Sequence, residues 1–230
     1  MTFGSVIWLG TDLTLAAIPV ALAFGIARGL RRDILASRRI RWELWLPLLV
    51  VWLLFLPNTC YLLTEWRHYL CDIHDRSAYY PIYSRGLYPP QTTGSLLVLT
   101  LFYGIYTGLG LVAFFLALWP LHRLARAGLG RATEPIRALI CLLCSVGVYL
   151  GLVSRFNSWD LVNGSRAAGL LATTAQIASR PALAALILLF GAGLWLLCAV
   201  FDIWMDGAAL RLANRRNNAF TEKDSPHASV

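Results

Sequence analysis

The stretch WELWLPLLVVWLLFLPNTCYLLTEWRH, residues 42–68, decides the fold. It begins as an apolar helix of membrane character, but Pro57 and Asn58 interrupt it before it has comfortably crossed a bilayer. Proline removes a helical hydrogen-bond donor and clashes with the preceding turn. In lipid, the freed backbone groups need partners from protein or water. A break followed closely by Glu65 and His68 therefore predicts a site at the end of this helix.

The composition indicates a membrane protein. Of the 230 residues, 58% are hydrophobic and 14% are charged, and the mean hydropathy is +0.61. Soluble domains carry about 25% charged residues. The length allows one transmembrane helical domain, residues 1–213, followed by a polar tail, residues 214–230, which we expect to be disordered and cytoplasmic.

Five stretches approach the roughly 20 apolar residues that a transmembrane helix needs. They predict an all-α, polytopic bundle of five membrane spans, at residues 5–27, 42–63, 94–121, 136–154 and 181–205. The first stretch does not read as a cleaved signal peptide, because its basic residues follow the apolar core instead of preceding it.

The arginines predict the orientation of these spans. Fourteen of the 20 basic residues lie between spans one and two, between spans three and four, or after span five. Positively charged loops are typically cytoplasmic, which places the N-terminus outside and the C-terminus inside. The net charge of +8 then reflects topology and contact with anionic lipid. The lipid bilayer is the expected partner, and no basic arm interleaved with aromatic residues predicts a nucleic-acid partner.

The two outer loops differ from the inner ones. Residues 70–93 are rich in tyrosine and proline, which is typical of an aromatic belt at the membrane interface, or of a lid over an outward-facing pocket. The second outer loop contains the apolar run 167–172, which is too short to span and predicts a re-entrant or interfacial helix.

Small residues at four-residue spacing predict close helix packing. They occur as Gly104 and Gly108, as Gly147 and Gly151, and as Ala21, Gly25 and Gly29. Such faces can form the interface of a homodimer or of a complex with another membrane protein. They can also pack against other helices within one bundle, and this interpretation is favoured.

Candidate site residues gather at the predicted outer face. Glu65 and His68 share one face of a helix, and Asp72 follows one turn later. This spacing suits a divalent ion, but it matches no established metal motif, so we predict no metal site. The alternative is a polar helix end that dips into the lipid headgroups.

Further polar residues are expected at the same face. Arg155, Asn157 and Asp160 follow span four, and Arg155 is suited to pair with Glu65 or Asp160. Asp12 lies near the outer end of span one, where a charge is a functional candidate. We predict that Asp12, Asn58, Glu65, His68, Arg155, Asn157 and Asp160 converge on one pocket in the outer leaflet.

The cysteines give less information. Cys60 and Cys71 are both expected on the outer side, where a disulfide is permitted, and their separation leaves the pairing open. Cys141, Cys144 and Cys198 are expected as small apolar core residues.

The motif LPNxxYLLTExxH at residues 56–68, together with RFNSWD at residues 155–160, resembles an uncharacterised family of bacterial membrane proteins, domain-of-unknown-function family thirteen sixty-one. The resemblance covers roughly spans two to five. It implies residence in the bacterial plasma membrane and supplies no reaction. Members commonly carry aspartate where this chain has Glu65, which preserves the charge but lengthens the side chain by one methylene group.

Three functions fit these residues. The favoured one is a non-enzymatic membrane component that binds a small ligand, ion or partner at the outer site, with Glu65 and His68 binding or relaying protons. The others are a small transporter or channel subunit, and an enzyme acting on a lipid with Glu65 and His68 as base and acid. No P-loop, nucleophile elbow or dinucleotide fingerprint indicates a cofactor.

Overall fold

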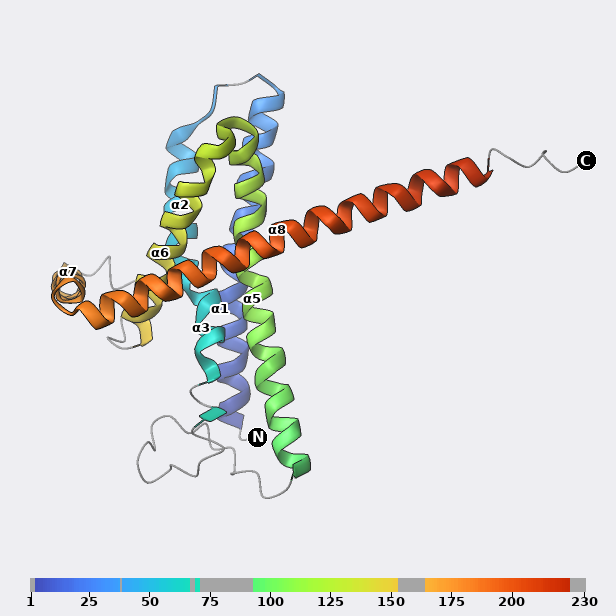
Figure 1. Ribbon diagram of the computed structural model, residues 1–230. Coiled ribbons are helices and arrows are strands. Elements are labelled where there is room, and N and C mark those ends of the chain that lie inside the picture. Colours follow the sequence, from blue (N-terminus) through green and yellow to red (C-terminus); the bar gives the residue numbers. More distant parts are fainter. Residues whose placement is uncertain (1–2, 38, 67–68, 71–92, 153–163, 224–230) are drawn as a thin grey trace, which may run out of the picture.

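The computed structural model describes residues 3–37, 39–66, 69–70, 93–152 and 164–223 (Figure 1). Every regular element in these ranges is helical, which confirms the all-α prediction. The α-helices are α1 (Phe3–Leu35), α2 (Trp42–Phe55), α3 (Pro57–Tyr61), α5 (Thr93–Leu129), α6 (Thr133–Leu152), α7 (Gly164–Ser179) and α8 (Pro181–Lys223). Two short 3₁₀ helices, η1 (Leu62–Glu65) and η3 (Gly130–Ala132), complete the described elements.

Helices α1 and α5 run side by side in the same direction and form the long axis of the molecule (Figure 1). They contain 33 and 37 residues, so they extend about 50 and 55 Å at 1.5 Å per residue. Helix α2, continued by α3, and helix α6 return in the opposite direction (Figure 1). Since the hydrocarbon core of a bilayer is about 30 Å thick, the longest helices exceed it.

Four described segments are long and apolar enough to cross a membrane: Gly10–Leu35, Trp42–Thr64, Thr93–Leu152 and Pro181–Arg215. The third segment contains both α5 and α6, and therefore both of the predicted spans 94–121 and 136–154. The chain reverses between them at Gly130, whose φ of +57° is readily adopted by glycine. The hydroxyl of Thr133 donates to the Gly130 carbonyl at 2.6 Å and holds this turn.

The predicted interruption at Pro57 lies between α2 and α3. Helix α2 ends at Phe55 and α3 begins at Pro57, while Leu56 keeps a right-handed helical conformation. The Thr59 hydroxyl donates to the Leu56 carbonyl at 2.8 Å, and the Thr59 amide donates to the same oxygen at 3.1 Å. The interruption therefore keeps the direction of the chain, and local hydrogen bonds satisfy the Leu56 carbonyl.

Glycines on α5 and α6 allow this interrupted helix to approach closely. A Cβ at Gly147 would lie 2.6 Å from Pro57 Cγ, and a Cβ at Gly151 would overlap the Tyr61 ring. The Tyr61 hydroxyl also donates to the Gly147 carbonyl at 3.2 Å. The pair Gly147 and Gly151 therefore packs within the chain, as the favoured interpretation of the small-residue pattern predicts.

The other small-residue pairs differ from this one. A Cβ at Gly104 or Gly108 would meet no atom within 4 Å, and the same holds for Gly25. Gly29, in contrast, is covered by the Trp45 ring. No described residue packs closely against Gly104 or Gly108. Their role in binding a second copy or another membrane protein stays a prediction.

The core lies where α1, α2, α5 and α6 meet. Phe114, Leu56 and Cys60 are fully buried there, and the Trp52 indole donates to the Ala117 carbonyl at 3.0 Å. The Cys60 and Cys144 sulfur atoms are 3.5 Å apart as free thiols. Cys141, Cys144 and Cys198 are buried, as expected for small core residues, whereas Cys71 lies outside the described residues.

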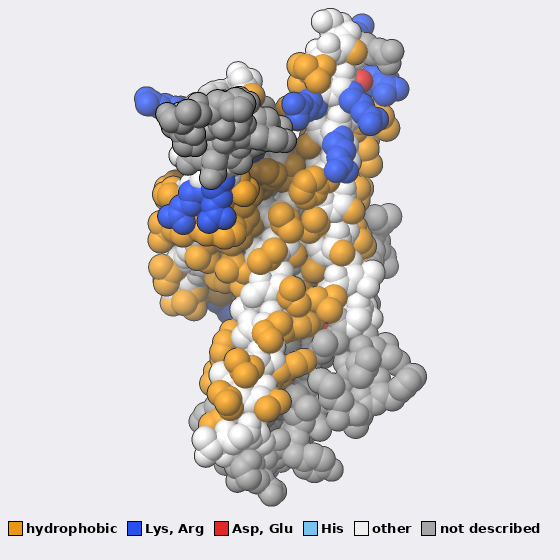
Figure 2. All heavy atoms as spheres, turned by 90° about the vertical axis from the view of Figure 1, so that its right-hand side faces the viewer, with side chains coloured by type: hydrophobic (Ala, Val, Ile, Leu, Met, Phe, Trp, Pro, Cys, Tyr) orange, Lys and Arg blue, Asp and Glu red, His pale blue; other side chains and the backbone are white. Residues whose placement is uncertain are grey.

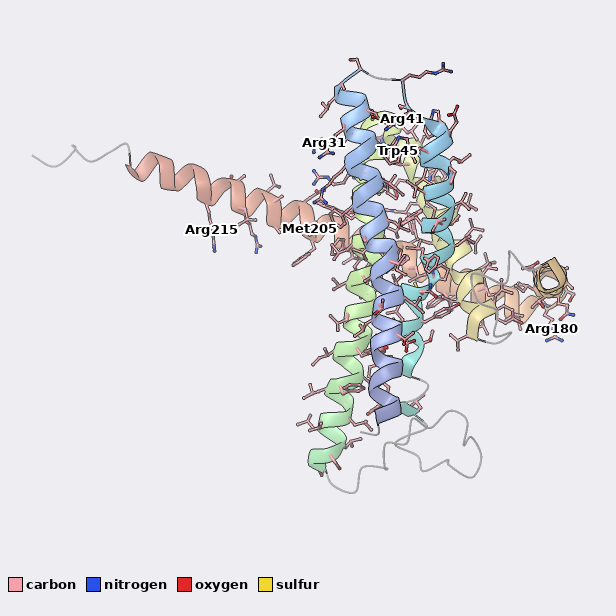
Figure 3. The ribbon with its side chains drawn as sticks, turned by 180° about the vertical axis from the view of Figure 1, so that it is seen from behind. Arg31, Arg41, Trp45, Arg180, Met205 and Arg215 are labelled. Atoms are coloured by element: carbon pink, nitrogen blue, oxygen red, sulfur yellow. The ribbon has the colours of Figure 1, made fainter. Side chains whose placement is uncertain are left out.

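Helix α8 crosses α6 and α5 at a steep angle and extends well beyond them (Figure 1). Arg180, which directly precedes α8, and Arg215, in its later part, lie on opposite sides of the bundle (Figure 3). The Ser145 hydroxyl donates to the Ile187 carbonyl at 2.7 Å, and Phe115 stacks on Phe201 at 4.5 Å between ring centroids. The helix continues to Lys223, so residues 214–223 of the expected polar tail are helical in the structure.

The apolar run 167–172 lies within α7. This helix has 16 residues, fewer than the roughly 20 that a span needs, and it packs beside the start of α8. The helical part of the prediction for this loop therefore holds.

The surface of the described residues is strongly apolar. Hydrophobic side chains cover much of the face shown in Figure 2, and lysine and arginine side chains gather toward its upper part. Arg31 and Arg41 lie at the same end of the bundle, beside the connection between α1 and α2 (Figure 3). Apolar helices with such a surface are suited to contact a lipid bilayer, as expected for a multi-pass membrane protein.

Candidate functional site

A cluster of charged side chains lies where α5, α6 and α8 meet. His122 comes from the last part of α5, Glu134 and Arg137 from the start of α6, and Asp202 from the middle of α8. The reversal at Gly130 places α5 and α6 next to each other, and the crossing of α8 brings Asp202 to them. We call these four residues the charge cluster.

Arg137 holds the charge cluster together. One terminal nitrogen donates to Asp202, and the other donates to Glu134 at 2.6 Å. The arginine side chain is 6% exposed, and the Asp202 side chain is less exposed than the Glu134 side chain, so the Asp202 ion pair is the more buried of the two. Charge-assisted bonds of this kind are about twice as strong as neutral ones, and the Asp202 bond links α6 to α8.

His122 lies between the two carboxylates. Its Nε2 is 3.5 Å from Glu134, and its Nδ1 is 3.7 Å from Asp202. Both distances exceed the usual range for a hydrogen bond, so the attraction is mainly electrostatic. Within the described part of the chain, His122 Nε2 and Arg137 Nε are buried without a hydrogen-bond partner. Both nitrogens have almost no accessible surface, so they lie inside the charge cluster and not on its surface.

The formal charges of the cluster are unequal. Two carboxylates face one guanidinium, which leaves one excess negative charge when the imidazole is neutral and none when it is protonated. The Arg137 guanidinium also lies 6.0 Å from the centre of the Trp195 ring, within the distance of a cation–π contact.

An apolar cavity of about 370 Å³ adjoins the charge cluster. It lies between the α1–α2 connection and the α5–α6 hairpin, at the arginine-rich end of the bundle. Its apolar wall includes Leu30, Trp42, Trp52, Leu121, Ile136 and Ile140. Its polar wall comprises His122, Arg137 and Thr133, of which Thr133 already donates within the turn. Small-molecule sites typically have this volume and this mixture of many apolar and few polar groups.

Contacts between α1 and α2 brace this region. The Trp45 indole donates to the buried carboxylate of Asp33 at 3.1 Å, and the same ring covers Gly29. Figure 3 shows Trp45 beside the arginine-rich end, near Arg31 and Arg41. This contact fixes the two helices that form one wall of the cavity.

The predicted outer site lies toward the opposite end of the bundle. Asp12 is half-buried on α1, and the Tyr106 hydroxyl donates to it at 3.2 Å. Asn58 is half-buried on α3, and Glu65 is the last residue of η1. The structure thus connects Asp12 to α5 and places Asn58 in the interrupted helix.

The remaining residues of that prediction fall outside what the structure describes. They are His68, Arg155, Asn157, Asp160 and the side chain of Glu65. The convergence of the outer site therefore stays a prediction. Within the described ranges no three His, Cys, Asp or Glu groups are placed to hold a metal ion, and Asp72, His74 and Asp75 lie outside them.

Sequence reasoning missed the charge cluster. Arg137 entered only the count of basic residues that sets the orientation, and Asp202 lies inside the predicted span 181–205 without being noted. An acidic residue inside a span is a functional candidate by default, so Asp202 was the available signal. Glu134 and Arg137 also have the three-residue spacing of a helical ion pair.

Comparison with known proteins gives a family and no function. A family model described as "Protein of unknown function (DUF1361)" matches residues 11–197. No curated protein and no solved structure matches the chain.

Proposed function

Since the chain belongs to this family of unknown function, which its model matches over residues 11–197, we propose a function from the site itself. The protein is a membrane component that binds a small amphipathic, lipid-like ligand in the apolar cavity. The observation that carries this proposal is an apolar cavity of about 370 Å³ whose wall also includes His122 and Arg137 of the charge cluster. Apolar ligand atoms would replace lipid or water along the wall, and the polar end of the ligand would lie beside these two side chains.

The proposed topology has five membrane segments. Four of them, α1, α2 with α3, α5 and α6, run along the axis of the bundle, whereas α8 crosses it at a steep angle, so the fifth span is supported by the length and hydropathy of Pro181–Arg215 alone. The arginines of the α1–α2 and α5–α6 connections lie at one end of the bundle, which supports a cytoplasmic location of that end. The N-terminus is then outside and the C-terminus cytoplasmic, in the bacterial plasma membrane. The cavity would open at the level of the inner leaflet.

Ligand binding is favoured over transport because the described core is apolar between Asn58 and the charge cluster. Leu56, Phe114 and Leu118 are buried there. A permeation path for a polar solute would need hydrogen-bonding groups along this interval. Packed apolar side chains fill this interval, which supports a binding site that is closed toward the outer face.

The outer polar site is a second proposal. It is supported by the half-buried Asp12 carboxylate, which receives the Tyr106 hydroxyl within a segment apolar enough to cross a membrane. It would bind a small ligand, ion or partner protein with the help of Asn58 and Glu65. Mapping where a lipid probe binds distinguishes the two sites.

The cavity is tested by filling it. Ala125 lines the cavity on α5, and replacing it by tryptophan is expected to weaken binding of a fluorescent monoacylglycerol to the purified protein by at least about tenfold. The matched control is Ala127→Trp, because Ala127 is exposed on the same helix and does not line the cavity. Equal binding by both variants and the unmodified protein would show that the ligand is not in the cavity.

A further inference from the structure

Cys60 and Cys144 form a pair of thiols between two helices. Cys60 comes from α3, the continuation of the interrupted helix, and Cys144 comes from the middle of α6. Their sulfur atoms are 3.5 Å apart, and both residues are free cysteines. A disulfide bond is about 2.0 Å long, so the two sulfur atoms need to approach by only about 1.5 Å to form one.

The helices that carry these thiols are closely packed. A Cβ at Gly147, one turn after Cys144, would lie 2.6 Å from Pro57 Cγ. The hydroxyl of Tyr61, which follows Cys60 in the chain, donates to the Gly147 carbonyl at 3.2 Å. A disulfide requires its two Cα atoms to lie within about 7 Å, which separates closely packed helices from distant ones. Contacts of this kind beside the thiol pair favour a cross-link between α3 and α6.

The surroundings of the pair select the oxidant by its charge. Cys60 and Cys144 are 0% and 1% exposed, and they belong to an apolar core that includes Leu56 and Val148. Moving a charged oxidant into such a core is costly, because charges lose their hydration there. An uncharged two-electron acceptor that dissolves in the membrane avoids this cost, and local opening of the helices admits it.

The sequence leaves Cys71 open as a disulfide partner of Cys60. The sulfur of Cys60, however, lies in the core and against that of Cys144. We infer that Cys60 and Cys144 are an oxidation-sensitive pair, which an uncharged two-electron acceptor converts to a disulfide that ties α3 to α6. In this step both S–H bonds break, one S–S bond forms, and two hydrogen atoms pass to the acceptor. The inference is independent of the proposed function, because neither thiol lines the cavity.

The cross-link would fix the interrupted helix against α6. It joins residues 84 positions apart, and a disulfide that closes a long loop stabilises a protein mainly by constraining its unfolded chain. The midpoint of thermal unfolding is therefore expected to rise by about 5 °C on oxidation and to fall back when a reductant is added. An unchanged midpoint in fully cross-linked protein would overturn this part of the inference.

The test uses diamide, an uncharged diazene whose N=N bond takes up two hydrogen atoms and becomes a hydrazine. The full-length protein in lipid vesicles is treated with diamide and denatured, and the remaining thiols are counted as maleimide adducts by mass spectrometry. The chain has five cysteines, so we expect five adducts before treatment and three afterwards. Proteolysis of the treated protein is expected to yield one linked peptide pair, which contains Cys60 and Cys144.

Serine variants assign the lost thiols. Cys144→Ser is expected to keep all four of its thiols during treatment, whereas the control Cys71→Ser is expected to lose two of its four. The linked peptides come from the unmodified protein, so they test the pairing even if a variant does not fold. Five adducts after treatment would overturn the inference. A linkage of Cys60 to Cys71, Cys141 or Cys198 would overturn it as well.

Discussion

Replacing Arg137 by leucine is expected to destabilise the folded protein by about 3 kcal/mol, the lower end of the range for removing one partner of a buried ion pair. The substitution leaves Asp202 and Glu134 without their guanidinium. Their side chains are 20% and 38% exposed, so partial hydration offsets some of the loss. The measurement is unfolding of the purified protein in detergent, followed by the loss of helical circular dichroism.

Two companion variants make this prediction specific. Arg131→Leu removes an exposed arginine of η3 near the same turn, and it is expected to change stability by less than about 0.5 kcal/mol. The double variant Arg137→Leu with Asp202→Leu replaces the ion pair by apolar groups, which is often neutral, and it should recover at least half of the loss. Simply additive losses would show that Arg137 and Asp202 do not interact.

Adding one methyl group at Gly110 is expected to destabilise the protein by about 1–3 kcal/mol, as overpacking in cores typically does. The Cβ of Gly110→Ala would overlap Leu62 Cβ and lie 2.9 Å from the Thr59 carbonyl oxygen. One of these atoms is a backbone oxygen and the other is a Cβ attached directly to the backbone, so neither can move away by a change of side-chain rotamer. The interrupted helix would have to shift away from α5.

The matched control lies on the same helix. Gly108→Ala meets no atom within 4 Å, and alanine favours a helix over glycine by up to about 1 kcal/mol. The two substitutions should therefore shift thermal unfolding in opposite directions. A similar shift for both would mean that α3 and η1 do not pack against α5 at Gly110.

Local chemistry made much of the fold predictable. Pro57 cannot continue an α-helix without losing a hydrogen bond, and α2 ends beside it. Apolar stretches of sufficient length anticipated α1, α2, α5, α6 and the first half of α8. The contact of Gly147 and Gly151 with the interrupted helix follows from their four-residue spacing on one helix face.

The charge cluster depends on information that local patterns do not carry. Arg137 and Asp202 are 65 residues apart, and they meet only because α8 crosses α6 at one particular position and angle. The importance of Gly110 likewise depends on the rotation of α5 about its axis, which turns Gly110 toward Leu62 while Gly104 and Gly108 meet open space. Helix rotation and crossing angle are set by packing among all neighbours.

The length of α8 has a local cause, although the polarity of residues 214–230 predicts a disordered tail. Residues 208–215 are mostly alanine, leucine and arginine, which are all strong helix formers. The helix can therefore continue beyond the predicted span, although residues 209–215 are exposed. Polarity alone does not separate a solvent-exposed helix from an irregular tail.

The central claim is that a lipid-like ligand occupies the cavity at the arginine-rich end. The most direct measurement is photolabelling of the protein in vesicles with a diazirine-bearing monoacylglycerol, followed by mass-spectrometric mapping of the labelled residues. We predict label on the cavity wall, at residues such as Leu121, Ile136 and Ile140, that unlabelled monoacylglycerol removes and that Ala125→Trp prevents. Label confined to the surroundings of Asp12 and Asn58, or spread without competition over the exposed leucines of α8, would contradict the claim.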